Sequence, residues 1–581
     1  MECIVQGQDS VVVLPTGGGK SLCFQAPAAI MKGLTLVISP LISLMKDQVD
    51  ALTEVGVPAA RLDSSLSVAE QNAVFTAIQD KTIKLLYLSP ERLVSESFLE
   101  ILLHTELSFI AIDEAHCVSM WGHDFRPEYR QLGLLKQKFP DITIAAYTAT
   151  ATEQVREDIA EQLHLKDCQM LVGSFDRPSL VYKVQPRNNI LKQVCTVLER
   201  HKNESGIIYC IRRKDVDQLC VNLKDHGYNA VPYHAGMTNE GRKKNQDRFI
   251  NEKVDIIVAT VAFGMGIDKS NVRYVIHTGM PKSLEHYQQE SGRAGRDGLE
   301  AECCLFYSWG DYGIWKSLMR DMPAEAQKSA MLKLQEIYNF CTGGVCRHKT
   351  ILQYFGQDLA KDSCNACDIC LGELECIKDE LITSQKILSC IMRLDQRFGG
   401  EYTALVLTGS QEKRIIENNH HNLSTYGLLG DYSKHTVHGW IEQLVGQGCI
   451  EKTGEYNVLT VTPKGWTVLK DKEKPRLLKP TERPAKVSKV VNDSWDGVDK
   501  GLFGILRKLR AQIAGQSKVP AFIIFSDAAL RDMARRKPTT RETLLEVKGV
   551  GEKKCKQYGQ VILSAIKDYC QENVYYEDFE G

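Results

Sequence analysis

A glycine-rich turn near the start of the chain has the residue types that hold a triphosphate. Residues 11–13 form a β-branched run typical of a buried strand, and after the turn Lys20 and Ser21 open a helical stretch without breakers. Backbone N–H groups and the helix start would face an anion, lysine would reach the β- and γ-phosphates, and serine would hold Mg²⁺. An incidental glycine-rich turn is the alternative, because Leu14 stands where the usual pattern has its first glycine. The residues that we predict to bind ATP and Mg²⁺ here are Thr16, Gly17, Gly18, Gly19, Lys20 and Ser21.

A pair of carboxylates follows a later apolar run. Residues 109–112 read as a buried strand, and Asp113, Glu114 and His116 come directly after it. A carboxylate at the end of a buried strand, facing a phosphate loop, is where Mg²⁺ needs an oxygen ligand. We predict that Asp113 is associated with the metal and that Glu114 orients and activates the attacking water. A chance acidic pair on a surface loop is the alternative.

Two arginines spaced three residues apart stand between glycines in residues 289–298. An arginine delivered across a cleft to a γ-phosphate can raise the hydrolysis rate by about 10³–10⁵. Arg293 and Arg296 are therefore candidate arginine fingers, with an exposed pair in surface salt bridges as the alternative. Further upstream, residues 259–268 contain glycines of the kind found where a backbone approaches another group closely. Gly266 and Asp268 are therefore further candidates for the nucleotide site.

Four cysteines have metal-ligand spacing. The pattern C-x17-C-x2-C-x2-C suits a tetrahedral structural Zn²⁺ without an open coordination position. An iron–sulfur cluster is the competing interpretation, since four cysteines also serve there. The predicted ligands are Cys346, Cys364, Cys367 and Cys370, whereas Cys341 falls outside the pattern and reads as a core or free thiol.

Residues 117–130, the aromatic loop, have neither a helical nor a strand period. The loop mixes large aromatic residues with charges, a composition that suits stacking against unpaired bases. Its position just beyond His116 would tie base contact to hydrolysis. The residues that we predict to contact or sense DNA are Trp121, His123, Phe125 and Arg126.

The elements that must position these residues form two α/β blocks. Short apolar runs alternate with helical stretches, which predicts parallel sheets covered by helices on both faces. The expected strands are 34–39, 84–89, 109–112 and 143–147 in the first block, and 206–209, 230–233, 255–259, 274–277 and 303–307 in the second. Later, an amphipathic helix at 433–447 and a hairpin at 449–461 suggest a winged helix, a module that docks on duplex DNA. A hairpin in a protein-interaction domain is equally compatible with those residues.

Composition sets wider bounds. The 581-residue chain has a net charge of −1, and 19 scattered cysteines that we expect to be reduced thiols or metal ligands. Its longest apolar runs are shorter than a membrane span, and no secretory signal is visible. Residues 500–560 carry 14 Lys and Arg against 5 Asp and Glu, which suggests a module facing a polyanion, or a solvated face.

Together these motifs resemble the RecQ family of superfamily 2 DNA helicases. The phosphate loop, the acidic motif, the aromatic loop and residues 148–150 all match, and residues 39–48 and 89–92 resemble the family's DNA-contacting motifs. The resemblance implies two RecA-like parallel-sheet lobes, then a zinc subdomain, a winged helix and a small all-α HRDC bundle. The implied divisions are 1–174, 175–320, 321–372, 373–470, a flexible linker at 471–494, and 495–575.

The resemblance also implies function. We expect an ATP-dependent helicase that moves 3′ to 5′ in recombination and repair, with His116 and Gln289 among its catalytic motifs. Tyr456 would be the tip aromatic of a strand-separating hairpin, and Lys553 would contact DNA from the HRDC bundle. The implied partners are single-stranded and duplex or branched DNA, and single-stranded-DNA-binding protein through the winged helix. We expect a monomer in the bacterial cytoplasm, associated with the nucleoid and without a membrane contact.

One feature departs from the family pattern. RecQ proteins carry an aromatic residue, an arginine and a glutamine ahead of the phosphate loop that hold adenine, and residues 1–10 contain no such set. We therefore expect weak ATP binding with poor discrimination among nucleoside triphosphates. The rival interpretations are a scaffold that binds DNA structures with an impaired ATPase, and an RNA helicase, which the aromatic loop and the winged helix disfavour.

Overall fold

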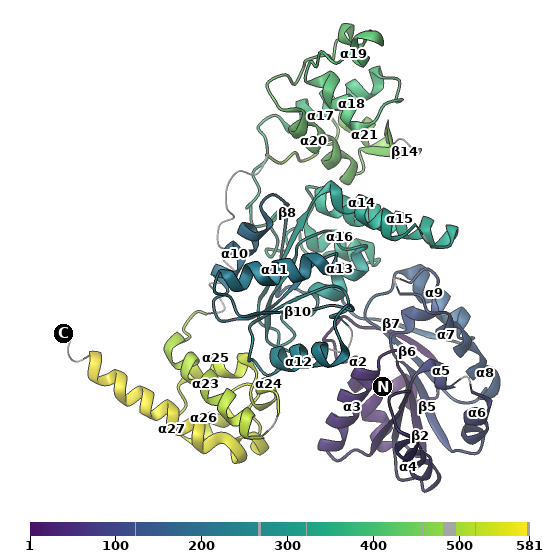
Figure 1. Ribbon diagram of the computed structural model, residues 1–581, viewed down its shortest axis with the longest axis vertical. Coiled ribbons are helices and arrows are strands. Elements are labelled where there is room, and N and C mark those ends of the chain that lie inside the picture. The colour runs from purple at the N-terminus through teal and green to yellow at the C-terminus, as the bar shows by residue number, and fades with distance from the viewer. Residues whose placement is uncertain are drawn as a thin grey trace.

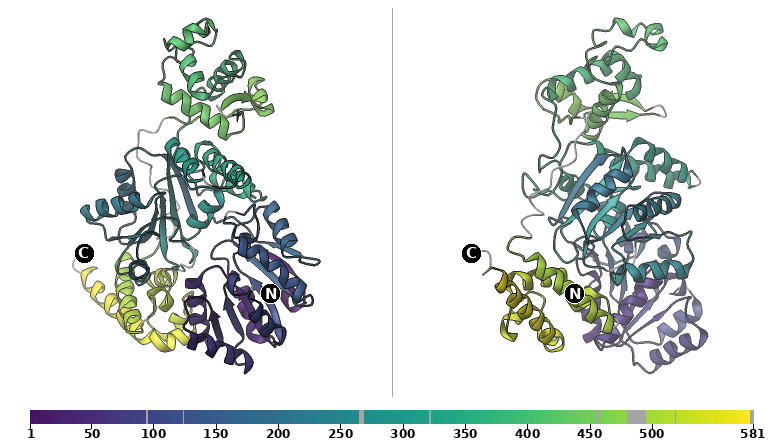
Figure 2. Two further views of the ribbon diagram at one scale, coloured as in Figure 1. Left: turned by 45° about the vertical axis from the view of Figure 1, so that its right-hand side comes forward. Right: turned by 60° about the vertical axis from the view of Figure 1, so that its left-hand side comes forward.

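A computed structural model describes residues 1–93, 95–122, 124–264, 269–320, 322–454, 457–479, 495–517 and 519–577. Within these ranges two α/β lobes lie side by side, a helical and hairpin domain stands at one end of the second lobe, and a helical bundle lies at its other end (Figures 1 and 2). None of the described helices is long and apolar enough to cross a membrane.

Lobe 1 is built on a seven-stranded parallel sheet in the order β3-β4-β2-β5-β6-β1-β7. Its strands are β1 Ser10–Val13, β2 Leu34–Ile38, β3 Ala59–Leu62, β4 Leu85–Leu88, β5 Leu107–Ile112, β6 Ile144–Thr148 and β7 Gln169–Val172. Its helices are α1 Glu2–Val5, α2 Lys20–Ile30, α3 Ile42–Glu54, α4 Val68–Gln79, α5 Pro90–Leu93, α6 Glu96–Leu103, α7 Pro127–Arg130, α8 Leu134–Lys138 and α9 Glu153–Gln162. Because β1, β6 and β5 are neighbours, the loops at their carboxyl ends meet at one edge, where open parallel sheets bind ligands.

Lobe 2 has a six-stranded parallel sheet in the order β10-β11-β9-β12-β13-β8. Its strands are β8 Leu180–Pro186, β9 Ser205–Tyr209, β10 Ala230–Tyr233, β11 Ile256–Ala259, β12 Val272–His277 and β13 Ala301–Tyr307. Its helices are α10 Ile190–Arg200, α11 Arg213–Asp225, α12 Asn239–Ile250 and α13 Leu284–Ser291. The two predicted parallel-sheet lobes are confirmed.

The ten strands predicted for the two lobes, residues 11–13 included, are present, and three strands were not predicted. β3 and β7 are edge strands with partly or largely exposed side chains, and each contains a polar residue, Arg61 in β3 and Gln169 in β7. β8 is buried, but Lys183 interrupts its pattern and is paired there with Glu302 at 3.4 Å and Glu373 at 3.0 Å. A strand that contains a buried charged residue cannot be recognised from its own sequence, because the residues that pair with the charge lie elsewhere in the chain.

The zinc subdomain follows lobe 2 without a break. Its helices are α14 Trp309–Leu318, α15 Ala324–Thr342 and α16 Arg347–Tyr354. Two bonds attach it to the edge strand β8: Tyr182 donates its N–H to Ala366 O at 3.1 Å, and Asp368 N–H donates to Tyr182 O at 2.9 Å. The subdomain thus continues the sheet of lobe 2.

The next domain has the predicted helices closed by a hairpin. It comprises α17 Glu380–Arg393, α18 Gly400–Leu407, α19 Lys413–Glu417, α20 Lys434–Gly446, β14 Ile450–Thr453, β15 Val458–Val461 and α21 Pro463–Leu469. The predicted linker does not separate from this domain at residue 471. Leu477 is buried in the domain core, and Trp440 Nε1 donates to Leu478 O at 2.9 Å, so residues 477–479 belong to the winged helix.

The C-terminal bundle comprises α23 Lys500–Ser517, α24 Ala521–Ile524, α25 Asp527–Arg536, α26 Arg541–Leu545 and α27 Glu552–Glu577. It has a core of its own around Leu502, Leu530 and Ile562. It lies near α12 at the end of lobe 2 opposite the winged helix (Figure 1).

Candidate active site

The phosphate loop, residues 15–20, joins β1 to α2 at the edge of the lobe 1 sheet. Gly17 and Gly19 have φ values of 82° and 79°, a left-handed backbone that glycine adopts without strain. A Cβ on Gly18 would lie 2.9 Å from Pro15 O, so the loop also has no room for a side chain there. Lys20 Nζ donates to Leu14 O at 3.1 Å. Burial lowers the pKa of Lys20, although Glu114 and Asp113 oppose this shift.

Two glutamine side chains hold Ser21 in place, and the sequence patterns did not predict these contacts. Gln48 on α3 donates from Nε2 to Ser21 Oγ at 2.8 Å, and Gln25 Nε2 lies 3.3 Å from Gln48 Oε1 and 2.9 Å from Tyr87 OH. Gln48 comes from the segment expected to contact DNA, but its side chain is turned to the phosphate loop. No spacing rule connects residues 27 positions apart on different helices, so only the fold shows this contact.

The acidic motif lies beside this loop, at the end of β5. Glu114 has a left-handed backbone with φ 48°, and its N–H donates to Asp113 Oδ1 at 2.9 Å. Such strain in a non-glycine residue costs about 1–3 kcal/mol and clusters at active sites. Burial, and then the charge of Glu114, raises the pKa of Asp113 to about 7. Two adjacent carboxylates beside Lys20 are a donor set that suits a divalent cation, so the site fits Mg²⁺.

His116 links the acidic motif to the end of β6. Its Nδ1 lies 2.9 Å from Thr148 Oγ1 and 3.3 Å from Glu114 Oε2. The ring is fully buried, and burial lowers its pKa, so the imidazole is neutral near pH 7. The hydrogen bond of Nδ1 goes to Thr148 Oγ1, and Glu114 Oε2 lies next to the same nitrogen.

Lobe 2 brings the two predicted arginines to different places. A Cβ on Gly17 would lie 3.4 Å from Arg296 Cγ, so Arg296 borders the phosphate loop across the lobe interface. Arg293 is buried within lobe 2, where a Cβ on Gly264 would lie 3.3 Å from its guanidinium. Gln289 lies on α13 and is partly buried, while Gly266 and Asp268 are outside the described residues. Of the two arginines, Arg296 is the one that lies next to the phosphate loop.

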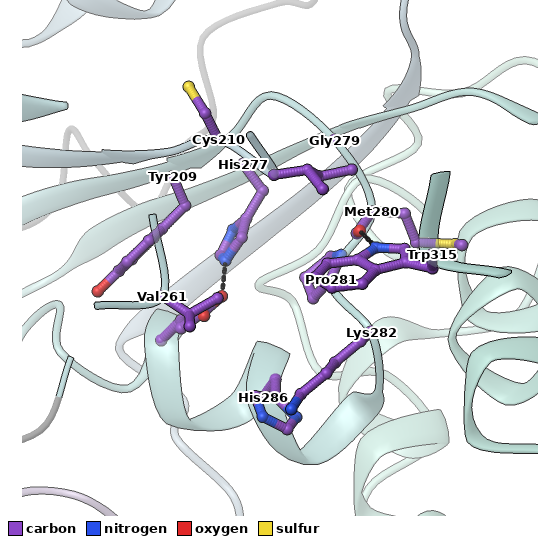
Figure 3. A pocket seen from close by; sticks show the side chains of 12 residues that line it. Tyr209, Cys210, Val261, His277, Gly279, Met280, Pro281, Lys282, His286 and Trp315 are labelled. Carbon is purple, nitrogen blue, oxygen red and sulfur yellow. Dashed lines mark hydrogen bonds and ion pairs between the residues drawn. The ribbon is translucent and has the colours of Figure 1, made fainter. Parts of the chain in front are cut away.

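A pocket of lobe 2 lies beside α13, at the carboxyl ends of β9 and β12 (Figure 3). Lys282 and His286 lie together at one end of it, and burial lowers the pKa of both. His277 Nε2 and Glu290 Oε2 are 2.8 Å apart, which fastens α13 to β12. This contact holds α13 in place, and the arginine segment, residues 289–298, continues from the end of that helix.

The aromatic loop packs directly on the acidic motif. A Cβ on Gly122 would lie only 2.2 Å from His116 O, so the loop backbone touches that carbonyl. Trp121 is 48% exposed, while Phe125 and Arg126 are partly buried. His123 lies outside the described residues. The exposed indole and the close backbone contact are what a sensor of stacked bases requires.

A lysine of the zinc subdomain holds the other side of this loop. Lys333 Nζ donates to Trp121 O at 2.7 Å and to Glu285 Oε1 on α13 at 2.6 Å. One ammonium therefore joins the aromatic loop of lobe 1, the α13 helix of lobe 2 and helix α15. No sequence pattern singled out Lys333.

The four predicted metal ligands come together. The Sγ atoms of Cys346, Cys364, Cys367 and Cys370 all lie within 4.8 Å of one another. Ala366 N–H and Cys370 N–H donate to Cys364 Sγ and Cys367 Sγ, both at 3.4 Å, and such bonds stabilise thiolates. This donor set fits Zn²⁺. Cys341 is buried outside the cluster, as a core thiol.

The predicted DNA contacts of the later domains have mixed outcomes. Tyr456 lies outside the described residues, between the confirmed strands β14 and β15. Lys553 is exposed at the start of α27, but the surrounding basic block is not one polyanion-facing surface. Arg510 is fully buried, 3.2 Å from Glu252 of lobe 2, and Arg531 lies 3.5 Å from Glu300. Part of the block therefore holds the bundle on lobe 2.

Comparisons with known proteins agree with this architecture. Family models match successive parts of the chain: DEAD/DEAH box helicase at 1–159, helicase conserved C-terminal domain at 188–298, RecQ zinc-binding at 309–371, RQC domain at 377–486 and HRDC domain at 499–566. The zinc-binding match confirms the prediction of Zn²⁺ for the cysteine cluster and favours it over the iron–sulfur alternative.

Full-length relatives give the same result. The chain is 43% identical over 572 residues to the ATP-dependent DNA helicase RecQ of Haemophilus influenzae, covering 97% of this chain and 92% of that protein. It is 40% identical over 567 residues to the protein of the same name from Bacillus subtilis, covering 97% and 94%.

Proposed function

The chain belongs to the RecQ family of ATP-dependent DNA helicases, and we propose that it moves 3′ to 5′ along one strand while ATP hydrolysis between the two lobes unwinds duplex or branched DNA. One observation supports this best. Arg296 of lobe 2 borders the phosphate loop of lobe 1, beside Asp113 and Glu114. Parts of one hydrolytic site therefore come from both lobes.

The residues have distinct roles in this proposal. Lys20 binds the β- and γ-phosphates, and the backbone N–H groups of the phosphate loop surround them. Ser21 and Asp113 would hold Mg²⁺, which would neutralise charge on the phosphates. Glu114 accepts the proton of the attacking water, and His116 holds its carboxylate by the contact of 3.3 Å. Arg296 stabilises the charge that develops on the γ-phosphoryl group.

Coupling to DNA would run through the aromatic loop. A base stacked on Trp121 would shift a loop whose backbone touches His116 O, and His116 in turn contacts Glu114. DNA binding would thereby change the position of the group that activates water. The winged helix and the HRDC bundle would hold the duplex, with Tyr456 and Lys553 as their contacts.

Two substitutions test the site. We expect Lys20→Ala and Glu114→Ala to abolish ATP turnover and unwinding, yet leave DNA affinity within about threefold, because neither residue faces nucleic acid. Lys32→Ala, which removes an exposed lysine of the same lobe, is the control and should behave as wild type. Unwinding at the wild-type rate in Lys20→Ala would refute the assignment. Duplexes with a 3′ or a 5′ tail test the polarity, and preference for the 5′ tail would contradict it.

We propose further that the protein acts as a monomer on nucleoid DNA in the cytoplasm and binds single-stranded-DNA-binding protein through the winged helix. The family membership supports these points. Light scattering of the purified chain tests the monomer. Pull-down with and without residues 373–479 tests the partner, and retention by the shortened chain would contradict it.

A further inference from the structure

We propose that Arg177 is a positioning residue for ATP hydrolysis, which holds the phosphate loop against the arginine segment. Its guanidinium donates from Nη1 to Thr16 O at 2.8 Å, and from Nη2 to Ala294 O at 3.1 Å and Gly295 O at 3.2 Å. A longer contact of 3.5 Å reaches Gly292 O. One side chain therefore bonds the backbone of both lobes at the point where they meet.

The carbonyls that Arg177 bonds are adjacent to the reacting groups. Thr16 precedes Gly17, and Gly295 precedes Arg296, the pair that lies in contact across the interface. A Cβ on Gly292 would lie 3.4 Å from Thr16 Cβ, so the two backbones are closely packed here as well. The guanidinium thus sets the separation between the phosphate loop and Arg296. A planar fork can bond carbonyls on both sides at once, which a lysine ammonium on a flexible stem does not reproduce.

The zinc subdomain holds the segment that carries Arg177. Phe175 stacks on Phe355, with ring centroids 4.3 Å apart and planes 8° apart. Gln357 accepts from Phe175 N–H at 2.9 Å and donates to Gly173 O at 3.0 Å.

The second anchor contacts the chain on both sides of Arg177. His348 Nδ1 lies 3.0 Å from Asp176 Oδ1, and its Nε2 lies 3.0 Å from Leu180 O. The chain is therefore fixed before and after Arg177 by His348 of α16 and by Phe355 and Gln357, which follow this helix. The zinc subdomain therefore acts on the ATP site through the segment that carries Arg177, in addition to its structural role.

This inference rests on the proposed hydrolytic site, and it predicts a particular kinetic signature. Arg177 bonds only main-chain carbonyls in these contacts, so its loss should leave the phosphate-binding groups in place but misplace Arg296. A misplacement of about 1 Å can cost about 10²-fold in rate. We expect Arg177→Ala to lower the DNA-stimulated kcat by about 10–100-fold, with KM for ATP and DNA affinity within about threefold of wild type.

A double-mutant cycle with Arg296→Ala tests whether Arg177 acts through Arg296. In the Arg296→Ala background, Arg177→Ala should change kcat by less than about threefold, because the group that it positions is gone. Arg177→Lys keeps the charge and should remain as slow as Arg177→Ala. Arg242→Ala is the control, since Arg242 bonds Asn239 on the surface of α12, and it should turn over ATP as wild type does.

Several outcomes would overturn the inference. Wild-type kcat in Arg177→Ala or in Arg177→Lys, or a full additional loss in the Arg296→Ala background, would each do so. If Arg177→Ala unfolds at a lower temperature and yields little protein, Arg177→Lys alone decides the question. An inactive wild-type chain would instead contradict the proposed function, so failure of this inference and failure of the proposed function are distinguishable. Gln357→Ala should give a smaller loss of kcat in the same direction, and an unchanged kcat there would contradict the anchoring by the zinc subdomain.

Discussion

Gly122→Ala should separate DNA sensing from basal hydrolysis. Gly122 does not have a positive φ, so alanine is tolerated by its backbone and only space is at issue. The added Cβ would lie 2.2 Å from His116 O and 2.9 Å from Ser119 O. Both are backbone atoms that cannot rotate away. Since Cβ···O contacts below about 3 Å essentially do not occur, the aromatic loop must move by about 1 Å from the acidic motif.

The magnitude follows from that displacement. A catalytic contact displaced by about 1 Å can lose about 10²-fold, which corresponds to about 2.7 kcal/mol. We expect the stimulation of ATPase by single-stranded DNA to fall by about 10–100-fold, while basal turnover stays within about threefold. Basal turnover needs Lys20 and Glu114, which the shift of the loop leaves in place.

The assay is ATP turnover with and without a saturating oligonucleotide, in parallel with DNA binding. Gly313→Ala is the matched control, because a Cβ on Gly313 in α14 meets no atom within 4 Å. It should be stimulated as wild type is. Equal fold-stimulation in Gly122→Ala and wild type would refute the proposed route from the aromatic loop to His116.

Further predictions concern the aromatic loop, the metal sites and the HRDC contact. Trp121→Ala should retain basal turnover and lose DNA stimulation by about tenfold or more, since it removes a stacking surface, and unchanged stimulation would contradict this. The pKa of Asp113 is raised to about 7, so below that pH a proton competes with Mg²⁺ for its carboxylate. Mg²⁺ affinity, measured by titration, should therefore strengthen about tenfold from pH 6 to pH 8, and a flat profile would contradict this. Cys364→Ala should abolish stoichiometric zinc and lower soluble yield, because structural zinc contributes to folding, and full zinc content by metal analysis would overturn this. Glu252→Ala removes the lobe 2 carboxylate from Arg510, which keeps the carboxylate of Asp527 in the bundle at 2.8 Å, so the bundle is held less tightly on lobe 2. Energy transfer between labels on α12 and α25 should therefore fall, and undiminished transfer would argue against the contact.

The sequence predicted those parts of the fold that local patterns specify. Central strands such as β4 Leu85–Leu88 are buried on both faces, so they appear as unbroken apolar runs. The edge strand β7 Gln169–Val172 has exposed side chains, and β8 contains Lys183, whose partners lie far along the chain. Neither has a pattern that distinguishes a strand from a loop.

The site shows the same division between local and distant residues. The phosphate loop, the acidic motif and the cysteines are short motifs, and each was identified by residue type and spacing. Arg177 and Thr16 are 161 positions apart, and no periodicity connects them. Composition likewise could not separate the exposed Lys553 from the buried Arg510, because both contribute equally to the charge of the basic block.

The most direct test of the account is unwinding of a 3′-tailed duplex by the wild-type chain and by Glu114→Gln, with ATP turnover measured in the same reaction. The substitution preserves the shape of the side chain and removes the base that activates water. The account predicts that wild type unwinds with DNA-stimulated turnover, and that Glu114→Gln binds DNA equally well but neither hydrolyses ATP nor unwinds. Unwinding by Glu114→Gln at the wild-type rate would contradict the claim that hydrolysis at this site drives the helicase.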